Sequence, residues 1–353
     1  MARYVVKRIL WLIPVILGVA VVIFTIMFFV PGDPAQIILG GSATAQEIAD
    51  LRESMGLNDP YPQQLLRFLK ETFLEFDLGQ SYVNNVEVSQ ALMERFPRTA
   101  LIAIVCCIAQ IIIGIPLGVI AATHQNRWQD RLCVVLAMIG ISIPSFWLAQ
   151  MMILLFSFKL GWLPAFGISS WKSFIMPCFC SMLMGVANQT RFTRTYMLEQ
   201  IRSDYVVTAR AKGLSETSII YRHALPNTLI PLITGIGGDF GAALGGTIII
   251  ENVFSIPGIG QYMVNAIGNR DYPVVRGSVI FLSIMFSLIM LIVDLAYAFI
   301  DPRIKAQYSS RGTSHRNKPG KPRKPKGQAA AGTAANLSQS AAQTTTEGGE
   351  AHA

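Results

Sequence analysis

The chain alternates between long apolar segments and shorter polar ones. Six segments are apolar over enough residues to cross a bilayer as a helix, which takes about 17–25 residues. They lie near 9–30, 99–123, 132–158, 173–190, 228–250 and 277–300. Only 14% of the residues are charged, against about 25% in soluble domains. The pattern therefore predicts an all-α membrane protein with six transmembrane helices.

The first apolar segment follows a basic start, as a secretory signal peptide would. It runs over residues 9–30, however, whereas the apolar region of a signal peptide covers about 7–15 residues, and no A-x-A cleavage site follows. We therefore expect residues 1–30 to remain as the first transmembrane helix, ended by Pro31 and Pro34, which cannot continue a helical ladder.

The basic residues predict the orientation, because they concentrate in cytoplasmic segments. Most of the 29 lysines and arginines fall near the N-terminus, in the turn after residue 123, in segment 191–227 and after residue 300. Segment 31–98 is richer in acids. Both termini are therefore expected inside and 31–98 outside.

The outer segment 31–98 is predicted to contain amphipathic helices. Thr44 and Glu47 have the spacing of a capping box, and Pro62 suits the start of a second helix. The apolar positions that follow suit a helix lying on the membrane or on the protein's outer face. These positions are Leu65, Leu66, Phe68, Leu69, Phe73 and Phe76.

Motifs for enzymatic chemistry are absent from the sequence. It contains no G-x-x-x-x-G-K-[ST] loop for ATP phosphates and no catalytic motif, and its four histidines are dispersed. All five cysteines lie in apolar segments, where they suit packing better than metal binding. We expect no enzymatic activity, no metal site and no nucleic-acid partner. Residues 306–353 are basic and rich in Pro, Gly, Ser and Thr, so they are predicted to form a disordered tail.

Asp239 is the ionisable residue deepest within a predicted span. Charges there cost about 2.5–3.5 kcal/mol, so Asp239 is a candidate to line a water-filled path; the alternative is a paired or neutral carboxyl within the bundle. Gly237, Gly241 and Gly245 share one helix face at i, i+4 and i+8. Small residues at this spacing let a second helix approach closely. Asp294 is expected to make a structural hydrogen bond, and Glu251 to face water.

Segment 191–227 is long, basic and prone to helix. Ser203 suits the N-cap of one helix, Gly213 suits a left-handed C-cap, and Ser215 suits the N-cap of a second helix. Pro226 is expected to end that second helix before the next span begins. The prediction is a helix–turn–helix on the cytoplasmic face, suited to docking another protein or to resting on lipid headgroups.

The stretch "YVVTARAKGL" with "HALPN" resembles the cytoplasmic loop of bacterial ABC-importer permeases, E-A-A-x3-G-x9-I-x-L-P. Val207, Thr208 and His223 depart from that pattern. The variant form is similar to the dipeptide/oligopeptide/nickel branch, and strings such as "VPGDP", "SIPSFWLA", "ENVFSIPGIG" and "RDYPVVRG" extend the likeness over residues 1–305.

The resemblance implies a permease core over 99–305 with a coupling helix in segment 191–227. The residues that it assigns to ATPase coupling are Thr208, Ala209, Arg210, Ala211, Lys212, Gly213, Leu214, Ser215, Glu216, Ile219, Tyr221, Leu225 and Pro226. Ala209 and Gly213 are expected to permit close docking. For Arg210 and Lys212 three interpretations stay open: pairing with acids on the partner, solvation, and contact with lipid headgroups.

The implied partners are a second, homologous permease subunit, two ABC ATPase subunits that bind ATP and Mg²⁺, and an extracytoplasmic solute-binding protein. The chain itself would bind no cofactor, would sit in the bacterial inner membrane and would form half of a pathway for peptides or nickel. Two alternatives remain open from the residues: a proton-coupled secondary transporter using Asp239, and a membrane scaffold that transports nothing.

Overall fold

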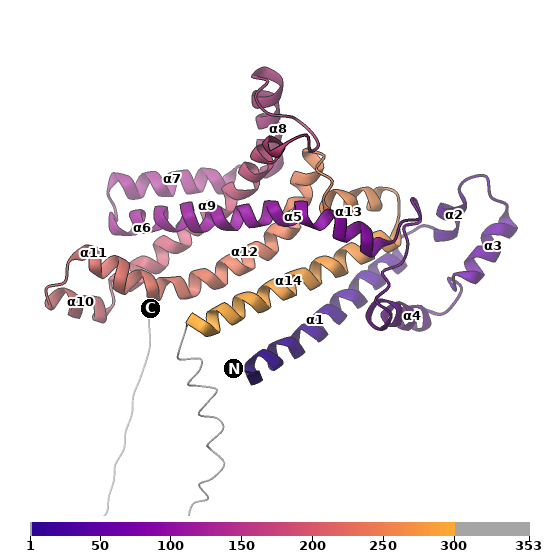
Figure 1. Ribbon diagram of the computed structural model, residues 1–353, viewed down its shortest axis with the longest axis horizontal. Coiled ribbons are helices and arrows are strands. Elements are labelled where there is room, and N and C mark those ends of the chain that lie inside the picture. Colours follow the sequence, from indigo (N-terminus) through magenta and orange to yellow (C-terminus); the bar gives the residue numbers. More distant parts are fainter. Residues whose placement is uncertain (1, 301–353) are drawn as a thin grey trace, which may run out of the picture. The chain divides into compact units, whose positions relative to one another are not determined.

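The computed structural model describes residues 2–300 (Figure 1). The tail 306–353, predicted to be disordered, lies outside the described residues. Within 2–300 the chain is helical, apart from one isolated β-bridge between Gln80 and Glu87. The helices, including short π-helical and 3₁₀ turns (η), are α1 (Ala2–Phe29), α2 (Pro34–Leu39), α3 (Ala45–Ser54), α4 (Tyr61–Leu74), α5 (Val88–Ala109), η1 (Gln110–Gly114), α6 (Ile115–Thr123), α7 (Trp128–Ser142), α8 (Ser145–Met152), η2 (Ile153–Lys159), η3 (Trp171–Phe174), α9 (Ile175–Ile201), α10 (Asp204–Ala211), α11 (Glu216–Ser218), η4 (Ile219–Ala224), α12 (Leu225–Val253), α13 (Ile259–Gly268) and α14 (Tyr272–Ile300).

Four helical stretches of the described region are long and apolar enough to cross a membrane. They are Arg8–Phe29, Val88–Thr123, Pro231–Val253 and Tyr272–Leu295, and the bent pair of α7 with α8 and η2 counts as a fifth if it is one span. The fourth predicted span, near 173–190, corresponds to α9. That helix has 27 residues but does not meet the same criterion, since its second half is polar and carries Arg191 and Arg194.

Pro144 does more than bend the third predicted span. Ile143 is extended (ψ 119°), as steric clash with a following proline favours. The axes of α7 and of the α8–η2 segment differ by 92°. The residues predicted as one span therefore form two helices that leave Pro144 in different directions.

Helix α9 is the centre of the packing, with α5, α6, α7 and α12 around it. Glycines permit the closest of these contacts. A Cβ on Gly114 would lie 2.8 Å from the Gln189 side chain, and one on Gly118 would overlap Thr193. Since the two glycines lie four residues apart, they present one smooth face to α9.

Helices α1 and α14 lie side by side (Figure 1). Arg8 Nη1 lies 2.9 Å from Asp294 Oδ2, and this ion pair joins the two helices. Asp294 thus has a structural polar partner, as predicted, but the partner comes from the other end of the described chain.

The predicted outer segment 31–98 includes the start of α5. Its part before α5, residues 31–87, is called the outer segment from here on, and it packs on α1 and on the start of α14. The predicted capping box of Thr44 and Glu47 is present at α3, and α4 begins next to Pro62. Phe68 of α4 stacks on Phe24 of α1, with ring centroids 5.1 Å apart. The Ser81 hydroxyl donates to Asp271, which immediately precedes α14.

Candidate functional site

Residues 203–224, called the elbow, form two short helical segments that meet at Gly213. Ser203 occupies the N-cap of α10, although its side chain makes no capping bond. The Ser215 hydroxyl accepts a hydrogen bond from Ser218 N and caps α11. Gly213 has φ 78°, a conformation that side chains disfavour. The helix–turn–helix predicted for this segment is therefore present, with glycine at the left-handed turn.

Three apolar residues hold the elbow together from inside. Val206, Ala209 and Ile219 form a small buried cluster between α10 and η4. Ala209 is 8% exposed and Ile219 0%. The methyl group of Ala209 therefore packs against the second arm of the elbow, and its part in close docking stays a prediction.

An ion pair joins the two arms across Gly213. Arg210 Nε lies 2.7 Å from Glu216 Oε1, and Arg210 Nη2 lies 3.2 Å from Oε2, so the guanidinium binds the carboxylate with two parallel bonds. The hydrogen bonds from Arg210 lower the pKa of Glu216, and the same bonds raise the pKa of Arg210. The structure thus pairs Arg210 within the chain, where the sequence suggested an acid on a partner.

Most of the residues around Gly213 face outward. Leu214 is 41% exposed, Val207 57% and Tyr221 58%, and a Cβ on Gly213 would meet no atom within 4 Å. Thr208, Ala211, Lys212 and Ser215 are also exposed. Three exposed apolar side chains around an open glycine form a small surface that another protein can cover.

The elbow continues into α12 without a break. The structure contradicts the expected helix end at Pro226, because α11, η4 and α12 follow one another directly. A proline has no N–H to give to the preceding turn, and the wider π-helical turn Ile219–Ala224 accommodates this loss. Nearby, the side-chain amide of Asn227 donates a hydrogen bond to the carbonyl of His223 over 3.0 Å.

Buried contacts connect the elbow to the bundle. Ala224 and Met197 are fully buried in one cluster with residues of α6 and α12, and Leu225 packs against it. The end of α9 is held by Arg194, whose Nε lies 2.6 Å from Asp130 Oδ1 of α7. The elbow therefore packs directly against α9 and α12.

Within α12 the predicted glycine face only partly contacts another helix. A Cβ on Gly237 would lie 2.7 Å from Val293 of α14, and one on Gly241 would overlap the Phe286 ring. Gly245 has open space around it. Two of the three glycines thus allow α12 to approach α14.

Asp239 is partly buried, and its Oδ2 has no hydrogen-bond partner among the described residues. Cys107 of α5 lies within electrostatic range of it. No group of three or more His, Cys, Asp or Glu in the described region is arranged to hold a metal ion.

Glu251 is the polar residue that the sequence reading misplaced. It was expected to face water, but its exposed fraction is 0%. Thr99 Oγ1 of α5 donates to Glu251 Oε1 over 2.7 Å, and Gln261 N donates to Oε2 over 3.1 Å. Thr99 Oγ1 also accepts from Ile259 N. The carboxylate therefore joins α12, α5 and the first turn of α13.

Comparison with known proteins matches the chain in two parts. Residues 1–103 match the N-terminal part of the binding-protein-dependent transport system membrane component, and residues 114–306 match the binding-protein-dependent transport system inner membrane component. The glutathione transport system permease protein GsiC of Salmonella paratyphi A is 42% identical over 308 residues, which cover 86% of this chain and 99% of that protein. The GsiC protein of Escherichia coli K12 is 40% identical over 305 residues, with the same coverage.

A solved structure supports the fold. The chain is similar to an inward-facing conformation of the MetNI methionine ABC transporter, with a TM-score of 0.52 and 20% identity over 60% of this chain and 97% of that one. Together with the apolar helices, these matches show that the chain is a multi-pass inner-membrane permease of the ABC-importer type, belonging to the binding-protein-dependent transport system inner membrane component family.

Proposed function

We propose that this permease imports small peptides by coupling its elbow to an ATPase that binds on the cytoplasmic side. The observation that carries the proposal is the continuity of the elbow with α12. The exposed surface around Gly213 lies at one end of a helix of 29 residues, and α13 follows its other end (Figure 1). Movement of the elbow would therefore reach the opposite side of the bundle.

The proposed membrane arrangement has six crossings with both termini in the cytoplasm. The crossings are α1, α5 to α6, the bent α7–α8 pair, α9, α12 and α14. Basic residues support this orientation, because Arg202, Arg210 and Lys212 lie on the elbow side. The outer segment then faces the extracytoplasmic space.

In this proposal the chain forms half of the pathway and hydrolyses nothing itself. A second, similar permease completes the pathway, two ATPase subunits bind ATP and Mg²⁺, and a solute-binding protein delivers the substrate. The family supports the presence of other subunits, since its members are components of binding-protein-dependent systems.

The names of the relatives support a peptide as substrate. Both GsiC proteins are permeases of glutathione transport systems, and glutathione is a tripeptide. We therefore propose small peptides, in preference to nickel.

The elbow is tested by two substitutions at one position. Gly213→Ala and Gly213→Trp both place a Cβ at φ 78°, so they share the backbone strain of about 1–2 kcal/mol and differ only in bulk. In right-side-out vesicles that carry the assembled transporter and are loaded with ATP, peptide uptake is expected to fall by at least ~10-fold for Gly213→Trp and to remain near wild type for Gly213→Ala. Equal uptake by the two variants would contradict docking at Gly213.

A carboxylate without a hydrogen bond, Asp239 Oδ2, favours one further test. If protons drove transport through Asp239, uptake would persist without ATP and would be lost in Asp239→Asn. The ATP-driven proposal expects the opposite result: Asp239→Asn retains ATP-dependent uptake, and wild type shows none without ATP.

A further inference from the structure

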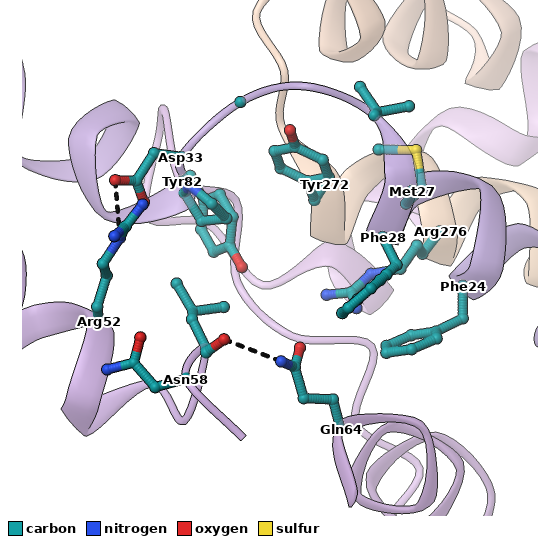
Figure 2. Close-up of a pocket in the computed structure, with 14 residues that line it drawn as sticks. Phe24, Met27, Phe28, Asp33, Arg52, Asn58, Gln64, Tyr82, Tyr272 and Arg276 are labelled. Carbon is teal, nitrogen blue, oxygen red and sulfur yellow. Dashed lines mark hydrogen bonds and ion pairs between the residues drawn. The ribbon is translucent and has the colours of Figure 1, made fainter. Parts of the chain in front are cut away.

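A cavity of about 300 Å³ lies between the end of α1, the outer segment and the start of α14 (Figure 2). A second cavity of about 420 Å³ adjoins it. The residues that line both are Phe24, Leu57, Gln64, Tyr82 and Arg276. Arg276 therefore stands on the wall that the two cavities share, away from the elbow and from Asp239.

Arg276 has aromatic neighbours and lies within electrostatic range of Glu71, but it forms no ion pair with any described residue. Its guanidinium carbon lies 4.9 Å from the ring centroid of Phe68 and 5.8 Å from that of Phe24. Its Nε is buried without a hydrogen bond, and no carboxylate within residues 2–300 forms an ion pair with it. Other arginines there do have such pairs, namely Arg8, Arg52, Arg67, Arg194 and Arg210.

This arrangement is costly unless a ligand completes it. A guanidinium stays charged in proteins. That of Arg276 is partly buried, and a buried Nε without a hydrogen bond is unfavourable. Cation–π contacts offset only about 0.5–2 kcal/mol. They do hold the guanidinium in one place, which lowers the entropy lost when an anion binds.

Two tyrosines line the same cavity. Asp271 accepts a hydrogen bond from Tyr82 N, 3.1 Å away, and so fixes the backbone that presents this ring. Figure 2 shows the Tyr82 hydroxyl and the Arg276 side chain pointing into the cavity, opposite Asn58 and Gln64. Burial raises the pKa of Tyr82, so its hydroxyl stays protonated and can donate. Tyr272 is 6% exposed, and its hydroxyl makes no hydrogen bond with any of the described residues.

We propose that this cavity binds a small peptide, with the Arg276 guanidinium and the Tyr82 hydroxyl on the peptide's carboxylate. The planar fork of a guanidinium matches a carboxylate with two parallel hydrogen bonds. On the other side of Arg276, Glu71 lines the second cavity, and its carboxylate makes no hydrogen bond or ion pair within the described chain. Arg276 lines both cavities and Glu71 lines the second. A zwitterionic peptide can therefore place its carboxylate on Arg276 and its ammonium group toward Glu71.

Size and charge favour a peptide over two other anions. Ligand cavities cover about 300–1,000 Å³, whereas the single acidic side chain of a docked protein would leave most of this space unfilled. An anionic lipid headgroup such as phosphatidylglycerol offers no ammonium group to Glu71. The inference rests on the proposed peptide import only for the choice of peptide.

The test measures equilibrium binding without ATP. The full chain, purified with its subunits in phosphatidylcholine nanodiscs, is titrated with glutathione and with glutathione whose two carboxyl groups are amidated. We expect the amidated peptide and the Arg276→Gln variant each to bind at least ~10-fold more weakly than glutathione and wild type, which is about 1.4 kcal/mol. Arg276→Lys is expected to restore part of the affinity.

Two further variants separate binding from folding. Tyr82→Phe removes one hydroxyl and keeps the ring, so an affinity loss of about 5-fold is expected with an unchanged unfolding midpoint. Arg67→Gln is the matched control, because Arg67 lines the second cavity but already pairs with Asp59; its affinity is expected to change less than ~2-fold.

Several results would overturn the proposal. One is equal binding of glutathione and its amidated form, and another is wild-type affinity in Arg276→Gln. Peptide binding that is absent in phosphatidylcholine, with phosphatidylglycerol retained through Arg276, would assign the cavity to lipid. Binding of the extracytoplasmic protein through Arg276 without binding of free peptide would assign it to an acidic side chain. None of these results depends on uptake by the Gly213 variants, so the two proposals fail separately.

Discussion

The two ends of α12 are built in opposite ways. At the elbow end, the carboxylate of Glu216 is exposed and pairs with Arg210 across a glycine that has open space around it. At the α13 end, the carboxylate of Glu251 is fully buried and accepts hydrogen bonds from α5 and from the first turn of α13. Glycine is used at both ends, but for different reasons: Gly213 permits a left-handed turn, and Gly260 permits close packing.

This difference shows which end is available to a partner and which end is fixed. A Cβ on Gly260 would lie 2.5 Å from the Ile248 backbone and 2.9 Å from the Glu251 carboxylate, so that end is closed by its own side chains. The elbow instead leaves Val207, Leu214 and Tyr221 uncovered. A helix fixed at one end and exposed at the other can act as a lever for a subunit that binds the elbow.

The largest effect is expected from Glu251→Ala. Removing the carboxylate leaves Thr99 Oγ1 and Gln261 N, which are part of the buried network, without an acceptor. Each orphaned donor costs about 1–3 kcal/mol, so the free energy of unfolding should fall by about 3 kcal/mol or more. The measurement is the thermal unfolding midpoint of the full chain in detergent.

Glu216→Ala is the matched control for Glu251→Ala, since it removes an exposed carboxylate near the other end of α12. Exposed ion pairs contribute little to stability, so its midpoint is expected to stay close to that of wild type. Equal midpoints for the two variants would show that the two ends do not differ in rigidity.

A smaller effect is expected from alanine at the glycines. Gly260→Ala forces a Cβ against the Ile248 backbone, and such overpacking costs about 1–3 kcal/mol. Gly213→Ala meets no atom and carries only the cost of a left-handed side chain, about 1–2 kcal/mol. The unfolding midpoint should fall further for Gly260→Ala. The reverse order would mean that the start of α13 accommodates an added methyl group at a lower cost in stability than the elbow does.

The smallest effect concerns pH and the Arg210–Glu216 pair. Arg210 lowers the pKa of Glu216. The ion pair is therefore fully present above the usual glutamate pKa, and it is lost as the pH falls through the lowered pKa of Glu216. Spin labels at Val207→Cys and Tyr221→Cys, on opposite arms of the elbow, should give a narrow distance distribution at neutral pH that broadens in acid. In Glu216→Gln the distribution should be broad at both pH values; a narrow one would show that the apolar cluster alone fixes the elbow.

Local signals predicted much of the fold. The capping box at Thr44, the helix end before Pro31 and the left-handed turn at Gly213 all depend on neighbouring residues, and all are present. The predicted helix end at Pro226 is wrong. Proline usually ends a helix, whereas here a π-helical turn before it lets the helix continue. The first half of α9 is apolar and the second half polar, so hydropathy alone does not decide whether it crosses the membrane.

The polar contacts of the site depend on distant residues and were harder to predict. Nothing near Glu251 in the sequence indicates that Thr99 of α5 binds it; the pair of glycines at 258 and 260 was the available signal for a closely packed loop. The sequence predicts the turn at Gly213 but not the direction in which the two arms leave it. The ion pair of Arg210 with Glu216 across that turn was therefore not predicted. The cavity around Arg276 could not be predicted either, because its aromatic neighbours Phe24 and Phe68 are distant in the sequence.

The ion pair between Arg8 and Asp294 bears on how the protein is made. A chain leaves the ribosome from its N-terminus, so α1 enters the membrane long before the helix that it binds has been synthesised. Through that interval the face of α1 later covered by α14 is open to lipid or to the insertion machinery. Docking of α14 thus marks the completion of the described helices, and a chain that is interrupted earlier displays an uncovered α1 that quality-control proteases can recognise.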